Sequence, residues 1–145
     1  MMHQYFFYIA GKAAIMNDKK RKYYIGAIGI GLNGLITRAS NIRNTTDSHN
    51  KHHAEYRLCE KFTSTSSVIY VARLSRLETS TFALARPCQK CLNTLCTRDV
   101  RKIYYTIDDT FYGVIKLKGG IIVSEKSKRI TYHNSFHRLI KRSIK

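Results

Sequence analysis

The sequence predicts one α/β domain in which helices cover a mixed β-sheet of about five strands. Helix-like and strand-like segments alternate along the chain in the order α-β-β-α-β-α-β. The 145 residues, 43% of them hydrophobic, suffice for one core. No repeat, linker or low-complexity tract divides the chain. We therefore expect a domain over residues 1–125, with 126–145 as a basic C-terminal extension packed on it or continuing it.

The first predicted elements are a helix and a β-hairpin. Residues 4–16 place apolar side chains near helical spacing, and the charged stretch 18–22 ends that segment. Two β-prone runs follow at 23–30 and 35–39. The Gly31-Leu32-Asn33-Gly34 segment between them has the composition of a hairpin turn.

The middle of the chain alternates between helix and strand after a polar loop at 40–51. Residues 52–62 carry apolar side chains on one helical face. The run 67–74 is β-branched and aromatic throughout, which predicts a strand buried on both faces. A helix is expected to follow Pro87, and 100–107 reads as the next strand.

The C-terminal part adds one clear strand and a basic segment. Residues 111–117 follow too closely for a parallel crossover, so this strand should pair antiparallel with the preceding one. Residues 120–125 form a possible further extended segment. Asn134 or Ser135 is a candidate cap for a closing helix. Residues 126–145 contain seven Lys or Arg and no acid.

The charge balance indicates a polyanionic partner. The chain has 26 Lys and Arg against 9 Asp and Glu, a formal net charge of +17. Such a surface attracts phosphates in a salt-dependent manner. Composition alone is equally consistent with a device for solubility or a surface facing a scaffold.

No apolar run approaches the roughly 20 residues that span a bilayer, so we expect no membrane association. We expect a soluble intracellular protein of the cytoplasm or nucleus, or of a virus-infected cell or virion. The four cysteines are too few for a disulfide scaffold. Two of them lie three residues apart, which favours metal or redox chemistry.

His53-Ala54-Glu55 and Pro87-Cys88-Gln89-Lys90-Cys91 each open a predicted helix. Cys88 and Cys91 share one face of a first helical turn, where the positive helix end favours thiolates. With the His53 imidazole they make three zinc ligands and leave a fourth position for water. Glu55 lies roughly 200° around the helix from His53, so it can flank that water and move protons.

Other cysteines and histidines fit a metal site less well. Cys59 and Cys96 are expected to be buried without a metal role. His49 and His52 are alternatives to His53, but they precede the expected helix start and belong more naturally to the loop.

The chain resembles the zinc-dependent cytidine and deoxycytidylate deaminase superfamily, whose H-x-E…P-C-x-x-C signature it carries. The resemblance covers roughly residues 20–110 and implies a three-layer α/β/α cytidine-deaminase-like fold. It further implies Zn²⁺ on His53, Cys88 and Cys91, with Glu55 as the proton shuttle. Two more groups are implied as substrate contacts: Asn41 or Asn44 for the sugar, and Tyr105 for the base. Tyr105 is equally well a core aromatic.

The expected function is hydrolytic deamination of cytosine, rather than adenine, on a phosphate-bearing substrate. A nucleotide such as dCMP and a single-stranded nucleic acid both remain open. The antiparallel final strand resembles the branch of the superfamily that is typical of free nucleosides, whereas the charge and the many tyrosines favour a polynucleotide. Basic residues that could track a strand are Lys126, Lys128, Arg129, Arg138, Lys141 and Arg142. The alternative is a non-catalytic basic zinc module that binds nucleic acid or belongs to a viral or nucleoprotein assembly. A homo-oligomer or larger assembly is possible in either case.

Overall fold

The computed structural model describes residues 2–16, 24–42, 53–61, 66–75, 81–96 and 99–130. These residues form three helices: α1 (Met2–Ala14), α2 (Ala54–Lys61) and α3 (Gln89–Cys96). They also form seven strands: β1 (Tyr24–Gly31), β2 (Ile36–Ser40), β3 (Ser66–Leu74), β4 (Phe82–Ala83), β5 (Lys102–Thr106), β6 (Phe111–Lys118) and β7 (Ile121–Arg129).

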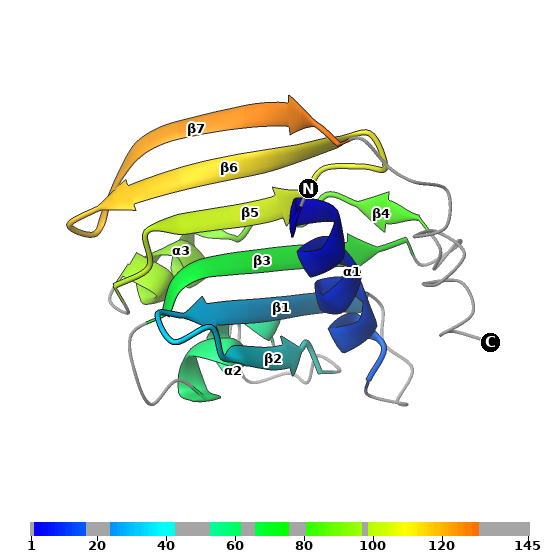
Figure 1. Ribbon diagram of the computed structural model, residues 1–145, viewed down its shortest axis with the longest axis horizontal. Helices are drawn as coiled ribbons and strands as arrows, with labels where there is room; N and C mark the ends of the chain where they lie inside the picture. Colours follow the sequence, from blue (N-terminus) through cyan, green and yellow to red (C-terminus); the bar gives the residue numbers. More distant parts are fainter. Residues whose placement is uncertain are drawn as a thin grey trace.

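The strands make one mixed sheet in the order β2-β1-β3-β5-β6-β7, and β4 pairs with the end of β3. Helix α1 packs on one face, and α2 and α3 pack on the other (Figure 1). The predicted α/β class with a mixed sheet is confirmed. The sheet has seven strands instead of about five, because two short or polar segments, β4 and β7, give little hydrophobic pattern.

The N-terminal helix and the hairpin lie where the sequence predicted them. Helix α1 buries Phe7, Ala10 and Ala14 against the sheet. In the turn from β1 to β2, the Gly34 nitrogen donates to the Gly31 carbonyl at 3.0 Å. Gly34 has a φ of 80°, a value that glycine adopts without strain. No helix in the described part of the chain is both long and apolar enough to cross a membrane.

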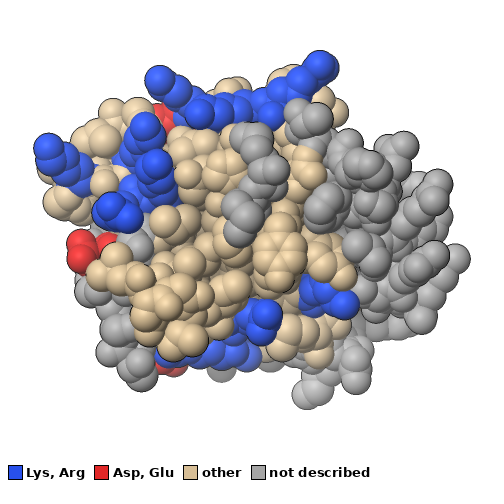
Figure 2. Space-filling view, viewed as in Figure 1, with Lys and Arg blue, Asp and Glu red and all other residues tan. Residues whose placement is uncertain are grey.

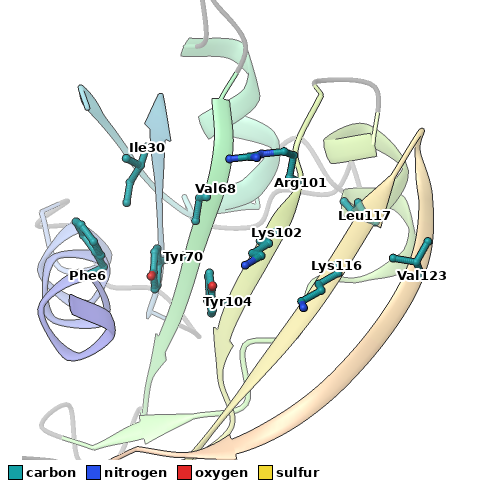
Figure 3. A pocket seen from close by; sticks show the side chains of 10 residues that line it. All are labelled: Phe6, Ile30, Val68, Tyr70, Arg101, Lys102, Tyr104, Lys116, Leu117 and Val123. Carbon is teal, nitrogen blue, oxygen red and sulfur yellow. The ribbon is translucent and has the colours of Figure 1, made fainter. Parts of the chain in front are cut away.

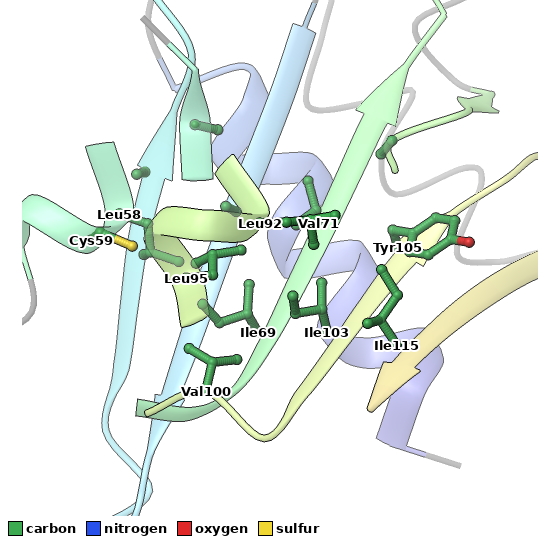
Figure 4. Close-up of a cluster of buried hydrophobic side chains, with 14 of the residues drawn as sticks. Leu58, Cys59, Ile69, Val71, Leu92, Leu95, Val100, Ile103, Tyr105 and Ile115 are labelled. Atoms are coloured by element: carbon green, nitrogen blue, oxygen red, sulfur yellow. The ribbon is translucent and has the colours of Figure 1, made fainter. Parts of the chain in front are cut away.

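Strand β3 is the centre of the sheet and is buried on both faces, as its continuous apolar run predicted. It pairs antiparallel with β1 and parallel with β5. Tyr70 enters the core under α1, whereas Ile69 and Val71 enter the core under α2 and α3. Figure 4 shows the latter core, in which Leu92 and Leu95 of α3 lie over the sheet.

The β6–β7 hairpin extends the sheet further than expected. Strand β6 pairs antiparallel with β5, as its short connection predicted. Gly119 and Gly120 both have positive φ, which matches the tight turn that follows β6. Strand β7 then runs without a break to Arg129, across the boundary expected at residue 125. The expected closing helix at 134–144 lies outside the described residues.

Gly26 is where α1 approaches the sheet most tightly, and Gly26→Ala is expected to destabilise the protein. A Cβ at this position would lie 1.9 Å from the Ala10 carbonyl oxygen and 2.5 Å from the Ala14 nitrogen. Because both are backbone atoms, the helix must move. We expect the free energy of unfolding to fall by about 1–3 kcal/mol in denaturant titrations. The exposed Arg38→Ala control on β2 should change it by less than about 0.5 kcal/mol; equal effects of the two variants would contradict this account.

Candidate metal centre

The first turns of α2 and α3 bring the predicted ligands together. The His53 carbonyl accepts the first hydrogen bond of α2, from the Arg57 nitrogen at 3.1 Å, and the Cys88 carbonyl accepts the corresponding bond of α3, from the Leu92 nitrogen at 2.9 Å. His53 and Cys88 are therefore the N-cap residues of the two helices. The helices pack against each other on the same sheet face. Two helix N-termini, each a partial positive charge, thus meet at one place.

The two nitrogen–sulfur separations in the cluster are those of a tetrahedral zinc site. His53 Nδ1 lies 3.4 Å from Cys91 Sγ and 3.7 Å from Cys88 Sγ, and all three atoms lie within 4.8 Å of one another. Tetrahedral geometry with ordinary Zn–N and Zn–S bond lengths requires about 3.6 Å between nitrogen and sulfur. Cys88 and Cys91 are both free thiols, so no disulfide competes with metal binding. The donor set fits a divalent metal ion such as zinc.

The two thiols differ in access to solvent. Cys91 is fully buried, whereas Cys88 is exposed, so the cluster opens to the surface at the start of α3. Burial first, and then the nearby Glu55 and Cys88, raise the pKa of the Cys91 thiol. A bound cation would reverse this preference, because it stabilises thiolate directly. The buried sulfur is therefore suited to a metal and unsuited to standing alone as a charged group.

Glu55 lies beside the cluster with one oxygen unsatisfied. The residue is 4% exposed, and its Oε1 atom has no hydrogen-bond partner. Burial raises the pKa of this carboxyl to about 7, while a backbone amide and the Cys91 side chain act in the opposite direction. An unpaired buried carboxyl oxygen costs about 1–3 kcal/mol. Such a cost is common at functional sites and rare elsewhere in a core.

Comparison with known proteins adds no identification. None of the known protein-family models matches this chain, and no curated protein sequence is significantly similar to it. The chemistry of the cluster therefore stands on its geometry.

The two asparagines that were predicted to contact a sugar follow β2 in the sequence. Asn41 is buried at the end of β2, where its Oδ1 accepts from the Ile25 nitrogen at 2.9 Å and its backbone nitrogen donates to the Ile25 carbonyl at 3.0 Å. These bonds continue the pairing of β2 with β1. Asn44 lies outside the described residues. A contact between either asparagine and a sugar stays a prediction.

Tyr105 lies in the core under α2 and α3, beside Ile103 and Ile115 (Figure 4). Its hydroxyl donates to Glu125 Oε2 at 2.6 Å. Gly113 on β6 leaves room for the ring, since a Cβ there would lie 2.0 Å from it. These surroundings are those of a core aromatic side chain, which is one of the two roles that the sequence allowed for Tyr105. A contact between Tyr105 and a base stays a prediction.

Next to the cysteines the structure shows a clamp that the sequence did not predict, in which hydrogen bonds join Arg86, Glu125 and Tyr105. Arg86, which precedes Pro87, donates to Glu125 through Nε at 2.8 Å and through a terminal nitrogen at 2.9 Å. Glu125 also accepts the Tyr105 hydroxyl, so it ties β5, β7 and the approach to α3 together. One signal was available, because Glu125 is the only acid after Asp109. Nothing local indicated its partners.

Glu125→Gln is expected to lower the melting temperature at pH 7 but to have less effect at pH 3. Hydrogen bonds from Arg86 hold the pKa of Glu125 below its ordinary value; partial burial opposes this and Tyr105 reinforces it. A carboxylate with a depressed folded pKa stabilises the fold above its unfolded pKa of about 4.3. That contribution is lost as the pH falls through the folded pKa.

Calorimetry of both proteins at the two pH values tests this account of the clamp. The exposed Glu60→Gln control should alter the melting temperature little at either pH. A Glu125→Gln effect of the same size at pH 3 and pH 7 would show that the ion pair is not its cause.

The predicted nucleic-acid contacts divide between described and undescribed parts of the chain. Lys126, Lys128 and Arg129 are exposed on β7. Figure 2 shows Lys and Arg side chains gathered over the edge of the molecule that β6 and β7 form. Arg138, Lys141 and Arg142 lie outside the described residues.

Proposed function

We propose that this protein is a zinc-dependent hydrolytic nucleobase deaminase of the cytidine or deoxycytidylate type. The observation that supports this most strongly is the meeting of His53, Cys88 and Cys91 donor atoms within 4.8 Å, beside the buried and unsatisfied Glu55 carboxyl. Three protein ligands are typical of catalytic zinc, whereas structural zinc has four. The order of these residues in the sequence is the order of the deaminase signature.

The chain contributes a metal-binding cluster and a proton carrier. His53, Cys88 and Cys91 would hold zinc, which would supply a water molecule acidic enough to act as a nucleophile near neutral pH. Glu55 would accept a proton from the attacking water and deliver it to the departing amino group. Cytosine and water would then give uracil and ammonia. A carboxyl pKa of about 7 suits a group that must both accept and donate a proton.

The proposed substrate carries phosphate. The net charge of +17 attracts phosphorylated molecules over long range. A free nucleotide and a single-stranded nucleic acid share this chemistry. Cytosine is the proposed base, and adenine is the alternative that the experiment must include.

The test combines metal content with a deamination screen. Freshly purified, reduced protein is analysed for zinc and then incubated with dCMP, AMP, and cytosine- or adenine-containing oligonucleotides at low and high salt. The proposal expects one zinc per chain and ammonia release from a cytosine substrate. Activity on dCMP that is equal at low and high salt, without activity on oligonucleotides, would exclude a polynucleotide substrate. Bound zinc with no ammonia release from any substrate would instead favour the non-catalytic zinc module.

A further inference from the structure

The described residues cover the sheet face that carries α1 only in part. Helix α1 packs on β1 and β3 and reaches β2. Its first turns also contact Tyr104 of β5 and Tyr112 of β6, through the rings of His3 and Phe7. In Figure 1 most of β6 and β7 lies beyond α1, and no other described helix lies on this face. The remaining area, over the start of β5 and over β6 and β7, is called the basic face below, after the residues that it carries.

The strand register places four lysines on the basic face. Lys102 of β5 is paired with Lys116 of β6. Lys126 and Lys128 of β7 are paired with Val114 and Tyr112 of β6, which lie on the same side as Lys116. Cross-strand neighbours lie about 5 Å apart, and alternate residues along a strand lie roughly 7 Å apart. The lysines thus form an array of positive charge across three strands.

No acid from these strands offsets the array. Glu125, the acid of β7, is paired with Ile115 and therefore points to the opposite side of the sheet, where it bonds Arg86. Uncompensated cations on a rigid sheet are well placed to neutralise several phosphates of one ligand.

A hollow of about 450 Å³ opens beside the lysines. Figure 3 shows Phe6 of α1 at one side, Tyr70 and Tyr104 in the floor, and Lys102 and Lys116 toward the sheet edge. The two tyrosine rings stack with centroids 4.6 Å apart. An apolar, aromatic floor with a cationic margin suits a flat ring that carries phosphate.

His3 of α1 lies close enough to the lysines of the basic face for their charge to affect its pKa. Its ring lies 4.5 Å from that of Tyr104, in the floor of the hollow. Burial lowers the pKa of His3, and the charges of Lys128 and Lys102 lower it further. Lysines from β5 and β7 therefore act on the same small region.

We propose that the basic face binds single-stranded nucleic acid, with phosphates on Lys102, Lys116, Lys126 and Lys128 and a base in the hollow. This site is separated by the sheet from the His53–Cys88–Cys91 cluster, which lies on the side of α2 and α3. A single strand is favoured over a duplex because only an unpaired base is free to enter an aromatic hollow. The proposal depends on the charge and shape of this face and not on deamination.

The test uses an oligothymidylate of about 20 nucleotides, which contains no amino group to hydrolyse. Fluorescence anisotropy is measured over a range of salt for the wild type and for Lys102→Ala/Lys116→Ala. Two lost phosphate contacts should reduce the slope of log K against log salt by about 1.4 and weaken binding about tenfold at low salt. The matched control, Lys12→Ala/Arg38→Ala, removes equal charge on α1 and β2 and should weaken binding less than threefold.

Several outcomes would overturn the proposal. Equal losses in the two double variants would mean that only net charge matters. Tighter binding to a duplex of the same length, or to vesicles rich in phosphatidylserine, would assign the basic face to another partner. If a strand with abasic sites bound as tightly as the intact strand, the hollow would not be a binding site for a base. Ammonia release from dCMP should be the same in wild type and Lys102→Ala/Lys116→Ala, so failure of the proposed deamination leaves this test intact.

Discussion

Glu55→Gln is expected to abolish ammonia release while leaving zinc content and folding unchanged. Loss of a positioned proton carrier lowers rates by about 10²–10⁴-fold. Glutamine keeps the shape of the side chain but cannot carry the proton. Because Oε1 has no hydrogen-bond partner, the substitution removes no polar contact from that atom. The thermal stability should therefore be maintained.

Three measurements separate the roles that Glu55 could have. Single-turnover ammonia release reports catalysis, elemental analysis reports zinc, and a thermal melt reports folding. Glu60→Gln, on the exposed side of the same helix, removes the same charge and should retain wild-type activity. Wild-type turnover by Glu55→Gln would refute the proton-carrier role, and loss of zinc from it would make Glu55 a ligand.

Cys91→Ser is expected to remove stable zinc binding and to produce the largest loss of stability among these variants. Cys91 is fully buried in the first turn of α3. Its sulfur is 3.4 Å from His53 Nδ1, so it links two elements that are 38 residues apart. With free zinc at about a thousandfold its dissociation constant, the bound metal contributes about 4 kcal/mol to folding.

The matched control is Cys59, a buried cysteine of α2 that is not part of the metal cluster. Cys59→Ser perturbs packing but should keep one zinc per chain and should still be destabilised by a chelator. Cys91→Ser should bind no zinc, and its melting temperature should not respond to the chelator. Retention of one zinc by Cys91→Ser, or indifference of the wild type to chelation, would refute the metal centre.

The sequence was informative wherever a property repeats along a short stretch. The continuous apolar run of β3 predicted a strand buried on both faces, because successive side chains of a strand point to opposite faces of the sheet. The short link before β6 required antiparallel pairing. Strand β7 was underestimated, because its alternating charged and small residues resemble an unstructured basic segment.

The candidate metal ligands were predictable, since His53, Cys88 and Cys91 each lie in a recognisable short motif at a helix start. Their partners were not. Glu125 and Arg86 meet across 39 residues, and neither carries a local pattern that selects the other. The basic face was equally hidden, because whether Lys102 and Lys116 are neighbours depends on strand register.

The amino-acid sequence is sufficient to predict the types and order of most elements, the three candidate ligands and the excess of positive charge. These follow from local periodicity and composition, which need no knowledge of distant contacts. Three further features required the folded structure: donor atoms at two helix starts lie close enough to hold one ion, Glu55 is buried beside them, and four lysines share one sheet face. Each of these depends on long-range packing and register, where a shift of one residue would turn a side chain to the other face.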